Sequence, residues 1–494
     1  MHTLHLWEHG NGREYALETG HFPWRNVVLS IFGFALLTRL AIAGAYLNAY
    51  DTEWNIMWGI ELQNGFYSAY THVTSLDYPP LYLYPLSAVG RLMAIDDIAG
   101  YPPFRMVAIK FLPCLTDSLT CVVLYRLGSK RARYWGAMAA ALWAVNPATI
   151  FNCAFWGQTD CVLLCLAAML FVALGERRVV ASGILFAAMC ATKLQGLYLA
   201  PVVGMEMLRI CFGSLHYRKF KLKQVKRYQV MKFLRFAGAV MGTLAVIYLP
   251  FMIGGAAASH DRFAGFFQPL TVYSGGVDKY PYITMNADNL YMLLGMNGVT
   301  DDTHLLLGLS ASLVGNFFLL ASVAAVSAVY VCGKRQSHWL TAYLMMESVF
   351  MLTCRQHERY QILTLVMLMG AFLQLADKRL FTVFSLQSAV IFFNQARVLG
   401  VVQEHSAWWE DYQVRNYAMD ALMRESRSQV MQRGAWWVRY SGVFSFWNAL
   451  GNVCLMAVSL TLVLRYFYDD RHKIPFLDRV GTWWNEFWEW RIHH

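Results

Sequence analysis

The sequence predicts an all-α, multi-pass membrane protein with about twelve transmembrane helices. Its 494 residues are 57% hydrophobic and only 15% charged, and the mean hydropathy is +0.36. Soluble domains are closer to roughly 45–50% apolar and about 25% charged. The net charge of +10 lies mainly in short connections between apolar runs. Membrane orientation requires that pattern, so the charge gives no support for nucleic-acid binding.

The first apolar run, residues 26–49, is long enough to cross a bilayer, which takes roughly 20 residues. It is too long for the apolar region of a signal peptide, and no small-residue cleavage site follows it. We therefore expect a retained first span with residues 1–25 in the cytoplasm. The ten cysteines lie mostly in apolar segments without paired spacing, so we expect small core residues and neither zinc ligands nor a disulfide framework.

Residues 50–104 form a long outer connection in this interpretation. We expect interfacial helices there, broken at Tyr78-Pro79-Pro80 and at Tyr101-Pro102-Pro103. The alternative makes residues 81–95 a full span. That segment is short and contains Arg91, and a span there would put the following basic segment outside, against the positive-inside rule.

The remaining spans alternate with basic inner loops, which place both termini in the cytoplasm. They are expected at 106–125, 136–153, 161–175, 179–194, 197–212, 234–253, 305–332, 339–353, 362–376, 380–401 and 442–466. Residues 26–253 and 305–466 thus form two membrane modules around a second outer connection, 254–304. The Trp-rich tail, 467–494, is expected to lie on the membrane as an amphipathic helix.

In this topology, the polar sequence clusters of the chain all fall on the outer side. Polar and ionisable groups at membrane depth are costly and usually face a cavity or a pathway. The sequence therefore predicts one outer site that contains Asp51, Glu53, Trp54, Tyr78, Gln158, Asp160, Lys193, Gln195, Asn286, Asn289, His357, Glu358 and Arg359.

These residue types suit a sugar that passes from a phospholipid carrier to an acceptor. A carboxylate can take a proton from an acceptor hydroxyl, Arg and Lys can hold a phosphate, and amides can bind sugar hydroxyls. Each residue also has a plainer interpretation. Asp51 would merely cap a helix, Lys193 would reach from a helix end towards water, and Lys110 and Asp117 would be internal packing partners.

The motifs that carry a family resemblance follow in order along the chain. They are Asp77-Tyr78-Pro79-Pro80-Leu81, Phe155-Trp156-Gly157-Gln158-Thr159-Asp160, Lys193-Leu194-Gln195, Asn286-Ala287-Asp288-Asn289-Leu290 and His357-Glu358-Arg359-Tyr360. Over residues 26–376 the chain resembles the GT-C superfamily of membrane glycosyltransferases, most of all the bacterial polyprenyl-phosphate-sugar-dependent enzymes. It is more distantly similar to the dolichyl-phosphate-glucose-dependent glucosyltransferases.

The resemblance implies a GT-C fold with Asp51 as catalytic base and Glu53 as the alternative. It implies that His357, Glu358 and Arg359 lie near the donor phosphate and that Gln158 and Asp160 line the cavity. The family's Lys-Pro-Gln is Lys193-Leu194-Gln195 here, and residues from about 380 onward match no family pattern.

The expected function is transfer of a hexose, mannose or glucose, from a polyprenyl-phosphate donor to a glycan or lipid-linked acceptor, with inversion. The expected partners are the lipid-linked donor, the acceptor and membrane lipids. No cofactor and no metal ligands are assigned, and the sequence leaves a dependence on divalent metal open. The alternatives are a transporter or flippase of a lipid-linked saccharide, and a scaffold that binds lipid-linked sugar without turnover. The two halves show no repeat, and the polar clusters lie at span ends, which disfavours the transporter.

Overall fold

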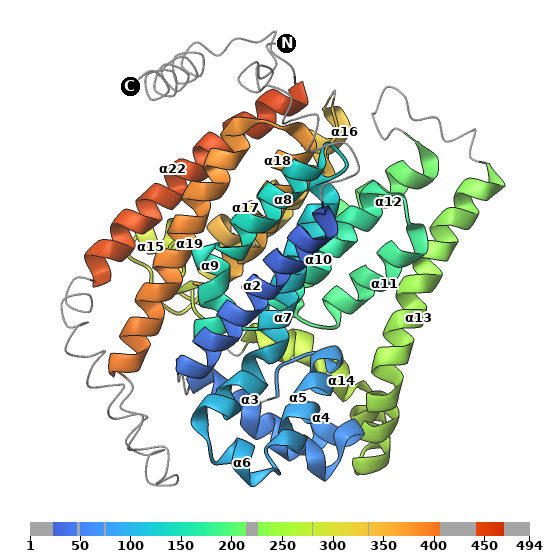
Figure 1. Ribbon diagram of the computed structural model, residues 1–494, viewed down its shortest axis with the longest axis vertical. Helices are drawn as coiled ribbons and strands as arrows, with labels where there is room; N and C mark the ends of the chain where they lie inside the picture. Colours follow the sequence, from blue (N-terminus) through green and yellow to red (C-terminus); the bar gives the residue numbers. More distant parts are fainter. Residues whose placement is uncertain are drawn as a thin grey trace.

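The computed structural model describes residues 23–46, 50–73, 76–213, 226–278, 280–333, 335–405 and 441–468. The described chain is mostly helical. Long helices lie side by side and short helices gather at one end, the lower end in Figure 1. Residues 214–225, part of the expected basic loop between the spans at 197–212 and 234–253, lie outside the described residues. So do residues 406–440, between the last two expected spans, and the tail from 469.

Five described helices are long and apolar enough to cross a membrane. They are α2 (Trp24–Ala45), α7 (Pro102–Gly128), α13 (Arg227–Ala258), α16 (Ala311–Cys332) and α22 (Ser441–Tyr468). The pair α8 (Arg133–Ala144) and Pro147–Trp156, bent by 47°, makes a sixth if it is counted as one span. Several crossings by one chain define a multi-pass integral membrane protein, as the sequence predicted.

The twelve predicted spans are not confirmed. Five of the predicted segments form helices of 12 to 16 residues, which are α10 (Asp160–Gly175), α11 (Val179–Cys190), α12 (Ala200–Phe212), α17 (His338–Leu352) and α18 (Leu363–Leu375). A sixth, α19 (Lys378–His405), has 28 residues but is less apolar than the five helices named above. Helices α17 and α18 are buried along nearly their whole length. An apolar sequence therefore reflects burial in protein there, which composition cannot distinguish from contact with lipid.

The first connection folds as predicted into short helices broken at prolines. Helix α3 (Tyr50–Glu61), the turns η2 (Leu62–Asn64) and η3 (Phe66–Ser68), α4 (Ala69–His72), α5 (Pro80–Leu92) and α6 (Asp96–Ala99) lead from α2 to α7. Pro80 and Pro102 each stand at the first turn of a helix, where proline lacks no needed N–H donor. Helix α5 packs on α3 and lies with the other short helices at the lower end of Figure 1.

The second connection is joined to the loop after α17 by a small parallel β-pair. It contains α14 (Arg262–Asp278), β1 (Thr284–Met285), α15 (Leu290–Leu293), β2 (His304–Leu306) and β3 (Leu309–Ser310). Strand β1 pairs with β4 (Gln356–His357), with Met285 opposite His357. This pairing fixes the backbone position of His357.

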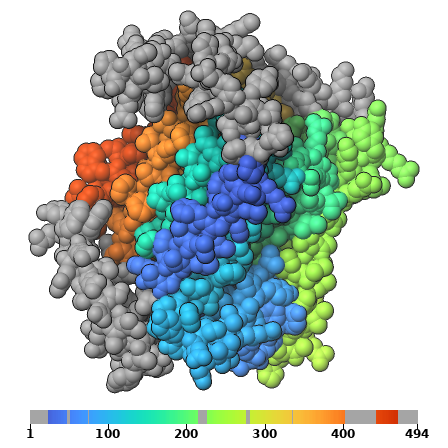
Figure 2. All heavy atoms as spheres, in the orientation of Figure 1, coloured from blue at the N-terminus to red at the C-terminus, as the bar shows by residue number. Residues whose placement is uncertain are grey.

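The main core lies among α7, α8, α10, α17 and α18. Helix α2 packs on α7 and α8 and lies across the outside of the molecule in Figure 2. A buried ion pair joins these layers, since Arg39 Nε donates to Asp117 Oδ2 over 2.7 Å. Trp143 Nε1 donates to the other oxygen of Asp117 over 2.9 Å. Asp117 is thus a packing partner as expected, although its partner is Arg39 and not Lys110.

Candidate functional site

A cavity of about 420 Å³ opens where α3, the loop before α5, and the loops before α10, after α11 and after α17 meet. It is lined by both acidic and basic side chains, by amides and by aromatic rings. Eight residues of the predicted site line it, which are Asp51, Trp54, Tyr78, Gln158, Lys193, Gln195, His357 and Arg359. The structure thus brings together residues more than 300 positions apart in the chain.

Asp51 lies in the first turn of α3, and one of its oxygens is held by two neutral donors. Oδ2 accepts hydrogen bonds from Trp156 Nε1 over 2.7 Å and from Gln158 Nε2 over 2.6 Å. Both donors flank Gly157, whose φ of +77° favours glycine. A Cβ there would approach Lys110 and Thr52 to 2.9 Å. Glycine is therefore needed for the turn that aims Trp156 and Gln158 at Asp51.

Lys110 stabilises this turn through two hydrogen bonds to backbone carbonyls. Its Nζ donates to the carbonyl of Tyr46 over 2.8 Å and to that of Phe155 over 2.9 Å. These carbonyls lie at the ends of α2 and of the π-helical segment η4 (Phe151–Trp156). Free carbonyls at helix ends need donors. One buried amino group on α7 therefore fixes both segments that flank Asp51 and its donors.

Beside the cavity, four charged side chains form a chain of contacts. Lys193 Nζ lies 2.5 Å from Asp160 Oδ1, and Arg359 Nη1 lies 2.5 Å from Glu358 Oε1. Arg359 Nε is 3.7 Å from Asp160 Oδ2, too far for a hydrogen bond. Burial lowers the pKa of Lys193, although Asp160 opposes the shift. Burial also raises the pKa of Glu358, and Arg359 opposes it.

His357 and Tyr78 add groups that stay neutral near pH 7. Burial, together with the charges of Arg359 and Lys193, holds the pKa of His357 well below its usual range. Burial raises the pKa of Tyr78. Gln195 is 6% exposed, and its Oε1 is buried without a hydrogen-bond partner. The cavity thus contains an unsatisfied acceptor beside the charged groups.

Five residues of the predicted site do not line this cavity. Asp160 and Glu358 stand behind it as the anions of Lys193 and Arg359. Glu53 is buried against Arg105, and burial raises its pKa. Asn289 begins α15 by accepting from the amide groups of Tyr291 and Met292. Asn286 exchanges hydrogen bonds with Asn297. Amide residues in a loop serve backbone turns as readily as ligands, so sequence alone could not separate them.

Sequence reasoning missed two positions that build the site. Trp156 is the second donor to Asp51, and its place two residues before Gln158 in the motif was the available signal. Asp288 binds five residues of α19 and α22, which are Asn394, Arg397, Ser445, Asn448 and Asn452. Its position within the Asn286–Leu290 motif carried no sign of that role.

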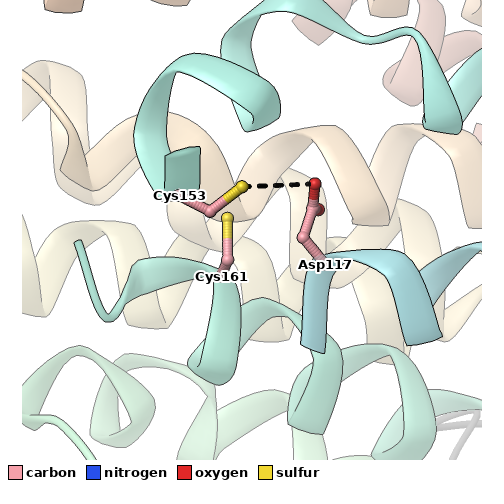
Figure 3. Close-up of side chains that lie close together, drawn as sticks. All are labelled: Asp117, Cys153 and Cys161. Atoms are coloured by element: carbon pink, nitrogen blue, oxygen red, sulfur yellow. Dashed lines mark hydrogen bonds between the residues drawn. The ribbon is translucent and has the colours of Figure 1, made fainter. Parts of the chain in front are cut away.

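Asp117, Cys153 and Cys161 form a cluster of possible metal ligands, but Asp117 already binds other side chains. The ligand atoms of Asp117, Cys153 and Cys161 lie within 4.8 Å of one another among the described residues (Figure 3). Both oxygens of Asp117 are already engaged, by Arg39 and Trp143. A guanidinium beside the carboxylate repels a metal cation. The cluster therefore fits a buried ion-pair network better than a metal centre.

Fold and cavity together define a class, a multi-pass membrane protein with a polar cavity built from its inter-helix connections. A family model described as GPI transamidase subunit PIG-U matches residues 59–273. A comparison with curated proteins finds no match to this chain. The matched segment contains Tyr78, Gln158, Lys193 and Gln195 of the cavity, whereas Asp51 and the loop at His357 lie outside it.

This match corrects the prediction of a GT-C glycosyltransferase. The family is described as a subunit of a transamidase, so neither a polyprenyl-phosphate-dependent hexosyltransferase nor a flippase is supported. The expected partners, a lipid-linked sugar donor and its acceptor, are therefore not supported either. The error has a physical cause. Carboxylates, amides, cations and aromatic rings suit any site that holds a phosphate-linked sugar, and residue types alone do not separate binding from transfer.

Proposed function

We propose that this chain is a non-catalytic membrane subunit of a GPI transamidase. The observation that carries the proposal is the match of residues 59–273 to the family of that description. This segment includes α5, α7, α10 and α11, which pack together and support the cavity. The proposed partners are the other protein subunits of the transamidase and its GPI-linked substrates.

We propose that the cavity binds the polar part of a GPI lipid, which by its name combines sugars with an anionic phospholipid. Asp51, Gln158 and Gln195 supply acceptors and donors for hydroxyl and amino groups. Lys193 and Arg359 supply charge for phosphate. Asp51 acts in this proposal as a binding group and not as a base.

We further propose that the cavity faces the lumen of the endoplasmic reticulum and that both termini are cytoplasmic. Basic residues gather at the far ends of the helices, around Arg126, Lys130 and Arg178, which surround Glu176. The positive-inside rule places that end in the cytoplasm. In this arrangement α10, α11, α12, α17, α18 and α19 also cross, which gives twelve passes.

The topology can be measured independently of the function. Single acceptor sites for N-glycosylation, inserted at His260 and at Arg131, should be glycosylated at the first position and not at the second. Glycosylation at Arg131 would contradict the orientation.

The function is tested by depleting the chain in its own cells. Proteins that carry a GPI-attachment signal should accumulate as unprocessed precursors, while complete GPI lipids remain present. The tagged chain should co-purify the transamidase in mild detergent. A truncated glycan on the accumulated lipid would contradict the proposal, because a transamidase subunit acts after the glycan is complete.

A further inference from the structure

Among the carboxylates that line the cavity, Asp51 is held by neutral hydrogen-bond donors and not by an ion pair within the described part of the chain. Asp51 forms no ion pair with any Lys or Arg in the described ranges, and its Oδ2 accepts only from the neutral donors Trp156 and Gln158. Its Oδ1 accepts no hydrogen bond from the same part of the chain, and Asp51 lines the cavity. A half-buried carboxylate in this state favours a positively charged ligand.

Two basic side chains that line the same cavity, Arg359 and Lys193, have N–H groups that are not used within the described part of the protein. Arg359 uses Nη1 for Glu358, while its Nε is buried without a hydrogen-bond partner. Lys193 donates to Asp160, and an ammonium has three donors. Both cations lie 5.5 Å from the ring centre of Tyr360. Two basic groups from different loops therefore converge at one point, as a phosphate requires.

Trp156 fixes the relation between the two charged groups. Its indole N–H donates to Asp51, while the guanidinium carbon of Arg359 lies 5.8 Å from its ring centre. The carboxylate and the guanidinium thus contact one indole and form no ion pair with each other among the described residues. A ligand in the cavity meets a negative and a positive group of the protein side by side.

We propose that the cavity recognises a zwitterionic group, a phosphodiester linked by a short chain to a primary ammonium. The ammonium binds Asp51 and the phosphate binds Arg359 and Lys193. The buried Oε1 of Gln195 accepts from a neighbouring hydroxyl. This inference rests on the proposed function and names the part of the lipid that the cavity selects. A phospholipid head group and a phosphoethanolamine carried by a sugar share this chemistry.

The test uses the purified full-length protein in an uncharged maltoside detergent with EDTA. The probes are glycerophosphoethanolamine, its N-acetyl derivative and mannose 6-phosphoethanolamine, and tryptophan fluorescence reports binding because Trp54 and Trp58 line the cavity. We expect the wild type to bind the free amines at least about tenfold more tightly than the N-acetyl probe, the range of a charge-assisted hydrogen bond. Tighter binding of the mannose probe would indicate the sugar-borne source, and equal binding the lipid head group.

Variants separate the two charges. Asp51→Asn should abolish the preference for the free amine, while Arg359→Gln should weaken both glycerol probes by a similar factor. Asp96→Asn, an exposed acid on α6, is the matched control and should behave as wild type. Equal wild-type affinity for amine and N-acetyl probes, a preference that survives Asp51→Asn, or no binding of any probe would each overturn the inference.

The result is separable from that of the proposed function. Asp51→Asn should still co-purify with the transamidase, because Asp51 faces the cavity. Probe binding without co-purification of the wild type would leave the cavity ligand standing and remove the subunit assignment. Co-purification without an amine preference would support the subunit assignment and remove the proposed cavity ligand.

Discussion

At the scale of single residues, burial determines which ionisable groups in the cavity can change charge. His357 is 7% exposed and contacts the rings of Tyr280 and Tyr360. The charged groups that face it are Arg359 and Lys193, which oppose its protonation, and Glu358, whose nearest oxygen is 3.9 Å from Nδ1. The low pKa of His357 means that the folded protein resists taking up a proton there.

This resistance predicts a loss of stability in acid. The unfolded imidazole has a pKa of about 6.5, so below that pH the unfolded state binds a proton that the folded state does not. Wild type should therefore lose stability relative to His357→Gln as pH falls, by up to about 2 kcal/mol between pH 6.5 and pH 5. Thermal melts of both proteins in detergent measure the difference. His304→Gln, at an exposed position, is the control, and parallel pH profiles of wild type and His357→Gln would refute the assignment.

Lys110 offers a second test at this scale. Lys110→Met keeps much of the side-chain length but removes the donor to Tyr46 and Phe155. We expect a loss of about 1–3 kcal/mol from the unsatisfied carbonyls. We also expect weaker binding of the zwitterionic probes, because Trp156 and Gln158 lose their support. Lys378→Met, at an exposed position, is the control for both measurements. Full binding by Lys110→Met would show that Lys110 does not position the site.

At the scale of elements, the first connection depends on the close approach of α3 and α5. A Cβ on Gly90 would lie 1.8 Å from the carbonyl oxygen of Gly59, and one on Gly59 would lie 2.5 Å from that of Leu86. Backbone atoms cannot move aside as a side-chain end can. The separation of these helices, and with it the place of Asp51 on α3, therefore requires glycine at the crossing.

We expect Gly90→Ala to lower stability by about 1–3 kcal/mol or more, as overpacking does, and to weaken probe binding. Gly33→Ala on α2, where no atom lies within 4 Å of the added Cβ, should be neutral or slightly stabilising. Melting temperature and probe affinity measure the two effects. Unchanged values for Gly90→Ala would mean that α3 and α5 do not meet as described.

At the scale of the whole molecule, one carboxylate joins the second connection to α19 and α22. Asp288 Oδ1 accepts from Ser445 over 2.5 Å and from Arg397 over 3.1 Å, and Oδ2 accepts from Asn448 over 2.7 Å. Burial raises the pKa of Asp288, although Arg397 opposes the shift. Asp288 thus holds α19 and α22 against the second connection. Strand β1 of that connection pairs with β4, the strand that contains His357.

Asp288→Ala should leave Arg397 buried without its anion, a loss of about 3–5 kcal/mol. Cleavage by a protease should become faster within α19 or α22, while the core of α7, α10 and α18 stays protected. Asp302→Ala, an exposed acid in the same connection, provides the control. Uniform loss of protection across all helices would instead show that Asp288 stabilises the whole fold and not these two helices in particular.

Much of the architecture was determined by the sequence alone. Apolar length predicted α2, α7, α13, α16 and α22, because a bilayer sets a minimum helix length. Prolines predicted the breaks at Pro80 and Pro102, because proline removes a donor and restricts the preceding residue. Eight residues of the predicted site also line one cavity, because isolated polar groups near a membrane gather where they can be solvated or paired.

Only the tertiary structure decided which polar residues face that cavity and which are paired with other groups of the protein. Asp51 and Asp160 are both acids at the start of a helix, yet Asp160 is neutralised by Lys193 and Asp51 is not. Lys110 and Arg39 are both buried basic side chains, and Lys110 binds carbonyls while Arg39 binds Asp117. The reason is that a buried charge is defined by its partners in space. Those partners come from segments far apart in the chain, whose meeting depends on the packing of every helix between them.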